Sequence, residues 1–256
     1  MRYIRCKSGD QIIFAEVLAA GLLQPLDAAP YAGGKPVGAT IDRTQVTLLA
    51  PCEPTKVVAI GKNYHDHIKE FDGQVPESPI IFIKANSSIN NPDGVIELPP
   101  QSVSQRIDYE GELAVVIGRT ASRVKAADAL DHVFGYTILN DVTARDVQKS
   151  DGQWARAKSM DTFCPIGPEI VTGEFDPDRV GIRTRLNGEI VQESNTEMLI
   201  WKTAALIEFI SETISLYPGD IIATGTPAGV GPMKDGDIVE VVIDGIGVLR
   251  NTVKAR

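Results

Sequence analysis

Residues 108–118 combine an unbroken apolar run with two glutamates, Glu110 and Glu112, at its entrance. Side chains alternate between the two faces of a strand, so both glutamates must point to the same side. Two like charges roughly 4 Å apart repel by about 4 kcal/mol at an effective dielectric near 20. A folded chain keeps such a pair only beside a compensating cation, which can be a metal ion, a lysine or an arginine. The alternative is a solvated edge strand with two unremarkable acids.

The composition restricts the partners of this chain. Its 256 residues suffice for one large domain, or for one domain and a small appendage, and its 43% apolar and 23% charged residues are ordinary for a globular protein. The net charge of -9 argues against nucleic acid and anionic membranes, because both require basic surface. The three cysteines lack metal-ligand spacing, and we find no signal-peptide core and no apolar run of membrane-spanning length. We therefore expect reduced thiols and a cytoplasmic protein.

Strand-like segments dominate the chain. Short strands within residues 1–52 predict a small N-terminal β domain, which proline residues near its end separate from a main domain in residues 53–256. In the main domain, Asn187-Gly188 predicts a hairpin, and apolar residues recur at helical spacing over residues 199–217. We expect a mainly β protein of the α+β class with a few flanking helices.

Two of the three histidines lie in a polar segment that follows a predicted buried strand. If this segment is helical, His67 and Glu70 are three residues apart and share one face. Residues 71–79 contain a glycine and two prolines and predict a mobile loop, which would place the pair on a lid. Taken alone, the segment is more typical of a surface helix turn.

Asp141 and Lys158 have ordinary explanations when each is considered singly. Asp141 follows a predicted strand, where acids commonly form turns, and a lysine such as Lys158 is usually solvated. The glycine-rich residues 224–232 could bring backbone amides close to a carboxylate, but they lack the lysine of a phosphate loop and the dinucleotide fingerprint. These features gain weight only in combination.

Five sequence blocks, taken together, resemble the fumarylacetoacetate hydrolase family. They are residues 63–70 (NYHDHIKE), 108–113 (DYEGEL), 140–146 (NDVTARD), 158–161 (KSMD) and 224–231 (TGTPAGVG). The blocks occur in family order from about residue 57 to the C-terminus. The resemblance implies a twisted β-sandwich-like roll with a few flanking helices. The N-terminal unit resembles the appendage of the dimeric members, which include acylpyruvases and oxaloacetate decarboxylases.

The resemblance also implies a role for each matched residue. The metal ligands would be Glu110, Glu112 and Asp141. The catalytic residues would be His67, Glu70 and Lys158, and the substrate-binding residues would be Lys84, Arg145, Gln148 and Thr226. The implied ion is Mg²⁺ or Mn²⁺, which agrees with an all-oxygen donor set. His65 and Ala85 depart from the family pattern, so the choice of His67 rests on its spacing to Glu70 and the turn after Lys84 is less defined.

The implied substrate is a small anionic 2-oxo acid with a second carbonyl at C4. The ion would chelate its carboxylate and 2-oxo oxygen, and His67 with Glu70 would activate a water that attacks C4. The ion and Lys158 would stabilise the enolate that forms when the C3–C4 bond breaks. We therefore expect a magnesium-dependent acylpyruvate hydrolase with additional oxaloacetate decarboxylase or tautomerase activity, acting as a homodimer without nucleic-acid or membrane partners.

Two alternatives remain open. One is an isomerase or decarboxylase of 2-hydroxyhepta-2,4-diene-1,7-dioate-type compounds from aromatic catabolism, which would use the same metal and enolate. The other is a non-catalytic metal- or metabolite-binding module. Release of pyruvate from acetylpyruvate supports the hydrolase, whereas a shifted diene absorbance without cleavage supports the isomerase.

Overall fold

A computed structural model describes residues 1–70 and 74–256, so the first part of the predicted 71–79 loop lies outside the described residues. The protein is mainly β, as the sequence predicts. The strands are β1 (Arg2–Ser8), β2 (Gln11–Val17), β3 (Leu22–Leu26), β4 (Ile41–Asp42), β5 (Thr47–Leu49), β6 (Val57–Gly61), β7 (Ile80–Lys84), β8 (Ile89–Asn90), β9 (Val95–Leu98), β10 (Ile107–Tyr109), β11 (Gly111–Ile117), β12 (Val133–Asn140), β13 (Thr143–Ala144), β14 (Cys164–Val171), β15 (Gly181–Leu186), β16 (Glu189–Asn195), β17 (Ile221–Ala223), β18 (Gly231–Pro232), β19 (Ile238–Ile243) and β20 (Gly247–Ala255). The α-helices are α1 (His65–Glu70), α2 (Arg145–Asp151), α3 (Ala155–Lys158) and α4 (Thr203–Ser211).

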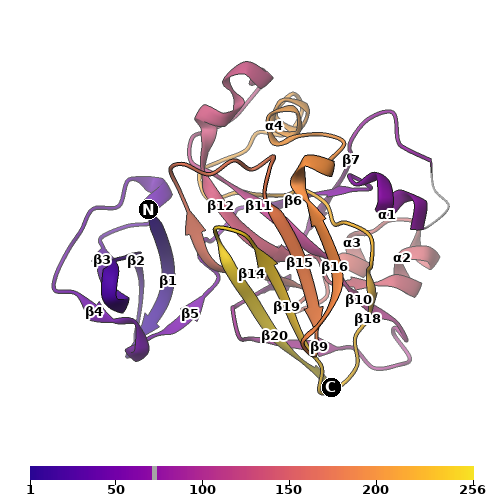
Figure 1. Ribbon diagram of the computed structural model, residues 1–256, viewed down its shortest axis with the longest axis horizontal. Coiled ribbons are helices and arrows are strands. Elements are labelled where there is room, and N and C mark those ends of the chain that lie inside the picture. The colour runs from indigo at the N-terminus through magenta and orange to yellow at the C-terminus, as the bar shows by residue number, and fades with distance from the viewer. Residues whose placement is uncertain (71–73) are drawn as a thin grey trace.

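The strands form three sheets. The largest has twelve strands, ten of them in the order β4-β3-β2-β1-β14-β12-β11-β17-β6-β7, with β5 paired to β1 and β8 paired to β14. A five-stranded sheet, β16-β15-β19-β20-β9, lies in front of it in Figure 1, and a three-stranded sheet, β13-β10-β18, completes the roll. Helices α1, α2 and α3 gather at one side of the roll, and α4 lies at another.

Strand β11 lies in the interior of the large sheet, between β12 and β17. All seven of its residues are buried, because one of its faces packs toward the five-stranded sheet and α4 while the other faces a second apolar cluster. A strand buried on both faces needs a continuous apolar run, which the sequence of β11 provides. The solvated edge strand considered for residues 108–118 is therefore excluded.

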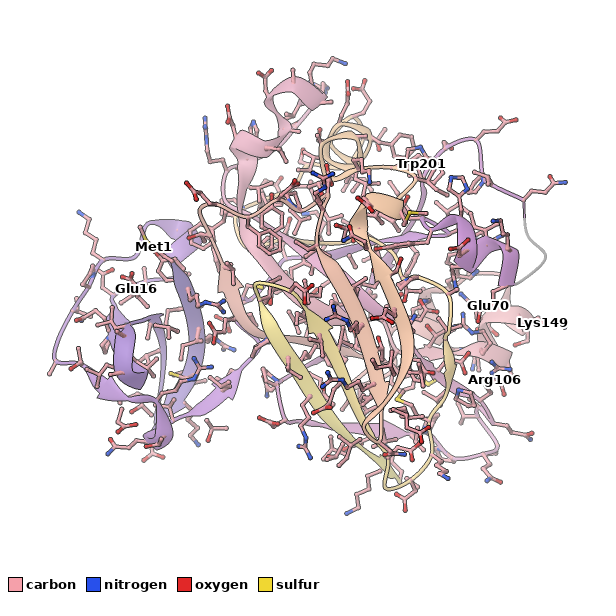
Figure 2. The ribbon with its side chains drawn as sticks, in the orientation of Figure 1. Met1, Glu16, Glu70, Arg106, Lys149 and Trp201 are labelled. Atoms are coloured by element: carbon pink, nitrogen blue, oxygen red, sulfur yellow. The ribbon has the colours of Figure 1, made fainter. Side chains whose placement is uncertain are left out.

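The N-terminal strands continue the large sheet of the main body. β1 pairs with β14 through Arg2↔Val171 and Tyr3↔Ile170, and β5 returns along β1. The small unit has its own apolar cluster around Ile4, Cys6, Ala15 and Leu23. Figure 1 shows it beside the roll, away from α1, α2 and α3, and in Figure 2 Glu16 of this unit lies at the opposite end of the molecule from Glu70 and Lys149.

Two local predictions in the main body can be compared with the structure. Asn187-Gly188 joins β15 to β16 as predicted, with both residues at positive φ, as a tight hairpin turn requires. The helix expected over residues 199–217 is shorter, because α4 spans only Thr203–Ser211. Before it, the Asn63 side chain binds both the N–H and the C=O of Trp201, and these bonds take the place of helical ones.

The described part of the chain holds no helix of the length and apolarity needed to cross a membrane. All three cysteines are free and buried.

Candidate active site

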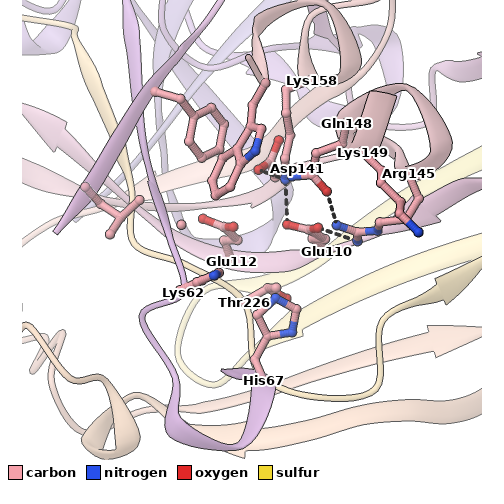
Figure 3. Close-up of a pocket in the computed structure, with 14 residues that line it drawn as sticks. Lys62, His67, Glu110, Glu112, Asp141, Arg145, Gln148, Lys149, Lys158 and Thr226 are labelled. Carbon is pink, nitrogen blue, oxygen red and sulfur yellow. Dashed lines mark hydrogen bonds and ion pairs between the residues drawn. The ribbon is translucent and has the colours of Figure 1, made fainter. Parts of the chain in front are cut away.

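Three carboxylates meet where β11 begins and β12 ends. Gly111 pairs with Asn140 across these antiparallel strands, so Asp141, the residue after β12, lies beside Glu110 and Glu112. One carboxylate oxygen of each residue lies within 4.8 Å of the other two. None of the three residues is more than 4% exposed. Figure 3 shows these side chains together in a pocket.

Two lysines bind this cluster from different elements. Lys158, the last residue of α3, places its Nζ 2.8 Å from Glu110 Oε2 and 2.6 Å from Asp141 Oδ2. Lys84, the last residue of β7, places its Nζ 2.5 Å from Asp141 Oδ1 and also donates to the backbone carbonyl of Lys158. Lys84 is fully buried and does not line the cavity. Its geometry fits a role in holding Asp141 and Lys158 better than the substrate contact expected from the sequence.

Arg145 opens α2, and its guanidinium binds side chains in and beside the cluster. Its guanidinium donates to Glu110 Oε1 at 2.6 Å, to Asp108 Oδ2 at 3.0 Å and to Gln148 Oε1 at 2.8 Å. Arg145 and Gln148 line the cavity, where the sequence placed them as substrate contacts. The planar guanidinium matches carboxylate geometry well, so Arg145 orients Glu110 before any ligand arrives.

The three carboxylates differ in how their charge is compensated. Burial alone would raise the pKa of Glu110, but Lys158, Arg145 and His67 hold it well below its usual range. The pKa of Glu112 is raised well above its usual range by burial and by the charges of Asp141 and Glu110. Within residues 1–70 and 74–256, Glu112 makes no ion pair, and it accepts a hydrogen bond of 2.7 Å from the Gly225 N–H. The described cations therefore compensate the negative charge of Glu112 less fully than that of Glu110.

This donor set fits a hard divalent cation. Three buried carboxylates supply oxygen atoms only, and the histidines and cysteines that zinc prefers are absent from the described cluster. A carboxylate oxygen can accept more than one bond, so the lysine contacts of Asp141 leave it able to coordinate an ion. A cation here would offset the repulsion that acts on Glu112. The buried acidic cluster is thus able to bind a divalent metal.

The histidine of the predicted pair lies on α1 and reaches the cavity. His67 Nδ1 lies 3.3 Å from Glu70 Oε2, as their spacing on a helix predicts. Burial lowers the pKa of His67 below its usual range, although Glu110 and Glu70 oppose this shift. The imidazole is therefore neutral near pH 7 and can accept a proton. His65 is exposed on the same helix and does not line the cavity, which favours His67 as the functional imidazole.

Glu70 is held in place by the loop after β17. Its two carboxylate oxygens accept from the Gly229 N–H at 3.2 and 3.3 Å. The carbonyl of Gly229 in turn accepts from the Tyr109 hydroxyl at 3.0 Å. Glu70 does not line the cavity itself, so it acts on a substrate only through His67.

The cavity has a volume of about 360 Å³, near the lower end of the range for small-molecule sites. Its apolar lining is formed by Ile60, Phe82 and Trp154, and Lys158 Nζ lies over the Phe82 ring, 5.1 Å from its centroid. The Phe82 and Trp154 rings pack edge to face, with centroids 5.3 Å apart. A side chain at Gly61 would lie 2.3 Å from the Trp154 ring, so only glycine permits this packing. The wall restricts the space available to a ligand.

Residues 56–254 match the family described as Fumarylacetoacetate (FAA) hydrolase C-terminal. The chain belongs to the fumarylacetoacetate hydrolase family. Residues 1–51 match a separate family, described as Rv2993c-like, N-terminal.

Relatives of this family member include proteins with and without a named activity. Protein Rv2993c of Mycobacterium tuberculosis is 47% identical, and the match covers 99% of this chain and 98% of the relative. The human mitochondrial oxaloacetate tautomerase FAHD2A is also 47% identical, with 83% of this chain and 71% of the relative covered. A crystal structure described as 5-carboxymethyl-2-hydroxymuconate delta-isomerase from Mycobacterium smegmatis is 43% identical, covers all of both chains and superposes with a TM-score of 0.93. The latter two are named as enzymes that rearrange small acids.

In this member of the fumarylacetoacetate hydrolase family, the fold brings most of the predicted site residues to one cavity. Those lining it are His67, Glu110, Glu112, Asp141, Arg145, Gln148, Lys158 and Thr226. Lys84 and Glu70 support the lining residues from behind. The apolar wall and two further lining lysines, Lys62 and Lys149, were not predicted from the sequence. Lys62 has a φ of 57°, which is uncommon for lysine. No local pattern in the sequence indicates this conformation.

Proposed function

We propose that this protein binds a small 2-oxo diacid and interconverts its keto and enol forms, with oxaloacetate as the first substrate to test. One observation carries the proposal. A neutral imidazole, oriented by Glu70, opens into the same cavity as the carboxylate cluster and Lys158. Keto–enol exchange needs such a base near the carbon that loses a proton and a positive charge near the oxygen that becomes negative.

Glu110, Glu112 and Asp141 would hold the divalent cation, for which we propose Mg²⁺. When bound, such an ion supplies Lewis-acid polarisation of a carbonyl oxygen, an effect of several kcal/mol.

His67 would accept the proton from C3 of the substrate. Its Nδ1 faces Glu70, so an Nδ1–H tautomer donates to that carboxylate and leaves Nε2 as the base. Lys158, held by Glu110 and Asp141, would offset the charge that develops on the 2-oxo oxygen. Return of a proton to that oxygen gives the enol with a C2–C3 double bond, and return to C3 gives the keto form with a C2–oxygen double bond, so the only σ-bonds that break or form are those to hydrogen.

Lys62 and Lys149 favour a substrate with a second carboxylate. Both line the cavity, and neither forms an ion pair with any carboxylate in residues 1–70 and 74–256. Oxaloacetate offers two carboxylates, whereas acetylpyruvate offers one. The relatives named as an oxaloacetate tautomerase and as a 5-carboxymethyl-2-hydroxymuconate delta-isomerase support the same preference, because both named compounds carry more than one carboxylate.

Acylpyruvate hydrolysis is the second candidate, and the His67–Glu70 pair is the observation that favours it. The same base could take a proton from water, whose oxygen would attack C4. Cleavage of the C3–C4 bond then gives pyruvate and a carboxylic acid. The sequence favours this reaction, whereas the named relatives and the two cavity lysines, which form no ion pair within the described residues, favour tautomerisation.

The test compares three substrates with Mg²⁺ and after its removal by a chelator. With oxaloacetate, we expect the enol absorbance to decay faster than without the protein. With acetylpyruvate, pyruvate should be released more slowly than oxaloacetate tautomerises. With a hydroxymuconate-type dioate, the diene absorbance should change little. His67→Asn should slow the favoured reaction about 10²- to 10⁴-fold while leaving Mg²⁺ affinity unchanged. His65→Asn, on the exposed face of the same helix, is the matched control and should retain full activity. Oxaloacetate decay that equals the uncatalysed rate in the presence of Mg²⁺ would overturn the proposal.

A further inference from the structure

Gln192 lies on β16, behind the cavity, and is 1% exposed. It is not a lining residue, but its side-chain amide makes four hydrogen bonds. Its Oε1 accepts from the Gly111 N–H at 3.1 Å and from Thr184 Oγ1 at 2.7 Å. Its Nε2 donates to Thr226 Oγ1 at 2.9 Å and to the Pro227 carbonyl at 2.8 Å.

Two backbone partners determine the orientation of this amide, because one can act only as a hydrogen-bond donor and the other only as an acceptor. The backbone N–H of Gly111 can only donate, so the atom that faces it must be the amide oxygen. The carbonyl of Pro227 can only accept, so the atom that faces it must be the amide nitrogen. A flipped Gln192 would place two donors together at Gly111 and two acceptors together at Pro227.

This orientation determines the direction of the Thr226 hydroxyl. Because Nε2 donates to Thr226 Oγ1, the hydroxyl hydrogen must point away from Gln192. Among residues 1–70 and 74–256, this hydroxyl makes no hydrogen bond other than the one it accepts from Gln192. Thr226 is 3% exposed and lines the cavity. The hydrogen therefore points to the space that a ligand would occupy.

We propose that Gln192 is a positioning residue that makes the Thr226 hydroxyl a hydrogen-bond donor to an anionic oxygen of the bound 2-oxo acid. The identity of this ligand rests on the proposed function. The same amide binds the backbone between Glu110 and Glu112 through Gly111, so one buried side chain fixes the donor relative to both carboxylates. A donor that is already oriented loses no rotational freedom when the ligand binds.

The experiment is a double-mutant cycle between Gln192→Glu and Thr226→Val. At a pH where the new carboxyl of Gln192→Glu is ionised, both side-chain oxygens accept, so the Thr226 hydroxyl turns toward residue 192 and away from the ligand. The readout is the dissociation constant of oxalate, a planar dianion that resembles the enolate of a 2-oxo acid, measured by calorimetry on the Mg²⁺-loaded protein. Mn²⁺ affinity and the unfolding midpoint are measured in parallel. Thr184→Val is the matched control, because it removes a bond to the same amide without reversing the hydroxyl.

Each single substitution should weaken oxalate binding about 10- to 100-fold, the usual effect of a lost hydrogen bond to a charged group. The double variant should bind oxalate within about threefold of either single variant, because both remove the same bond. Thr184→Val should bind oxalate like the wild type, and Thr226→Ser should keep the donor and most of the affinity. Mn²⁺ affinity should be unchanged in the Thr226 and Thr184 variants.

If the losses of oxalate affinity in the two single variants add up in the double variant, the assignment is overturned. Additive losses would mean that the new charge at position 192 weakens binding by a general effect, independent of the Thr226 hydroxyl. A Thr184→Val loss equal to that of Gln192→Glu would overturn it as well. If Gln192→Glu does not fold, Gln192→Met serves in the same cycle without added charge. Oxalate binding does not depend on turnover. A wild-type protein without activity would therefore contradict the proposed function alone. Additive losses of oxalate affinity in an active enzyme would contradict this inference alone.

Discussion

Asp220 and Glu112 are both buried carboxylates, but their partners differ. Asp220 is 0% exposed and accepts hydrogen bonds from the backbone N–H groups of Thr55, Lys56 and Tyr217. The Thr55 hydroxyl and the Lys56 ammonium also donate to it. Glu112 is 1% exposed, accepts one backbone hydrogen bond, from Gly225, and faces two other carboxylates.

This difference separates a structural acid from a functional one. The donors around Asp220 tie the start of β6 to the residue before β17, where these two strands pair in parallel. Its charge is satisfied by the protein alone. The charge of Glu112 is opposed by its neighbours, which favours its protonated form, so the ionised carboxylate needs an added cation. Burial by itself therefore does not identify a ligand, whereas the balance of donors and charges does.

Glu112→Gln should produce the largest effect on activity. The substitution keeps an acceptor for the Gly225 N–H but removes the charge that a cation needs, so Mg²⁺ binding and turnover should be lost. Loss of a Lewis acid worth several kcal/mol lowers the rate at least about 10³-fold. The apoprotein should be as stable as the wild type or more so, because repulsion at the cluster is relieved. Calorimetric titration with Mg²⁺, kinetics and denaturant unfolding test these outcomes, and retained Mg²⁺-dependent activity would remove Glu112 from the metal site.

Asp220→Asn should show the opposite pattern. One acceptor oxygen becomes a donor and the charge opposite Lys56 disappears, so the free energy of unfolding should fall by about 3 kcal/mol. At a temperature where the variant stays folded, Mg²⁺ affinity and turnover should match the wild type. Denaturant unfolding and kinetics on the same preparation check both. Lost Mg²⁺ affinity in the folded variant would show that the two carboxylates are not separate in function.

The pH dependence of the apoprotein should show the smallest effect. The folded pKa of Glu112 lies well above its ordinary value of 4.5, so below pH 4.5 both the folded and unfolded states hold the proton. As the pH rises above 4.5, the unfolded state loses its proton first, and this contribution to stability falls until the pH passes the folded pKa. The slope is at most about 1.4 kcal/mol per pH unit.

Comparison with Glu112→Gln isolates this effect, because His67 also titrates in this range and its lowered pKa acts in the opposite direction. The free energy of unfolding should be measured for both proteins in the presence of a chelator between pH 5 and 8. As the pH rises, the wild type should become steadily less stable relative to the variant. Saturating Mg²⁺ should abolish the wild-type decline, because the ion binds the ionised carboxylate. A difference that stays constant across this range would mean that Glu112 ionises normally.

Much of the fold and the candidate site could be predicted from local patterns. The alternation of side chains on a strand places Glu110 and Glu112 on one side, and helical spacing brings His67 to Glu70. The Asn187-Gly188 turn is likewise set by local backbone preference. The helix over residues 199–217 was predicted too long, because periodicity cannot show that Asn63 binds the backbone at Trp201.

The sequence by itself determined the kind of site this protein has, since its acids, its imidazole and the buried strand between them follow from residue type and spacing. Only the tertiary structure decided which long side chains meet the ligand. It turned Lys84 inward to Asp141, bound Arg145 to Glu110, and brought Trp154 and Phe82 together as the apolar wall. It also placed Gln192 between Gly111 and Thr226, at separations of 81 and 34 residues. The physical reason is that strand and helix periodicity act over a few residues, whereas the partners of a buried polar side chain are set by elements far away in the chain.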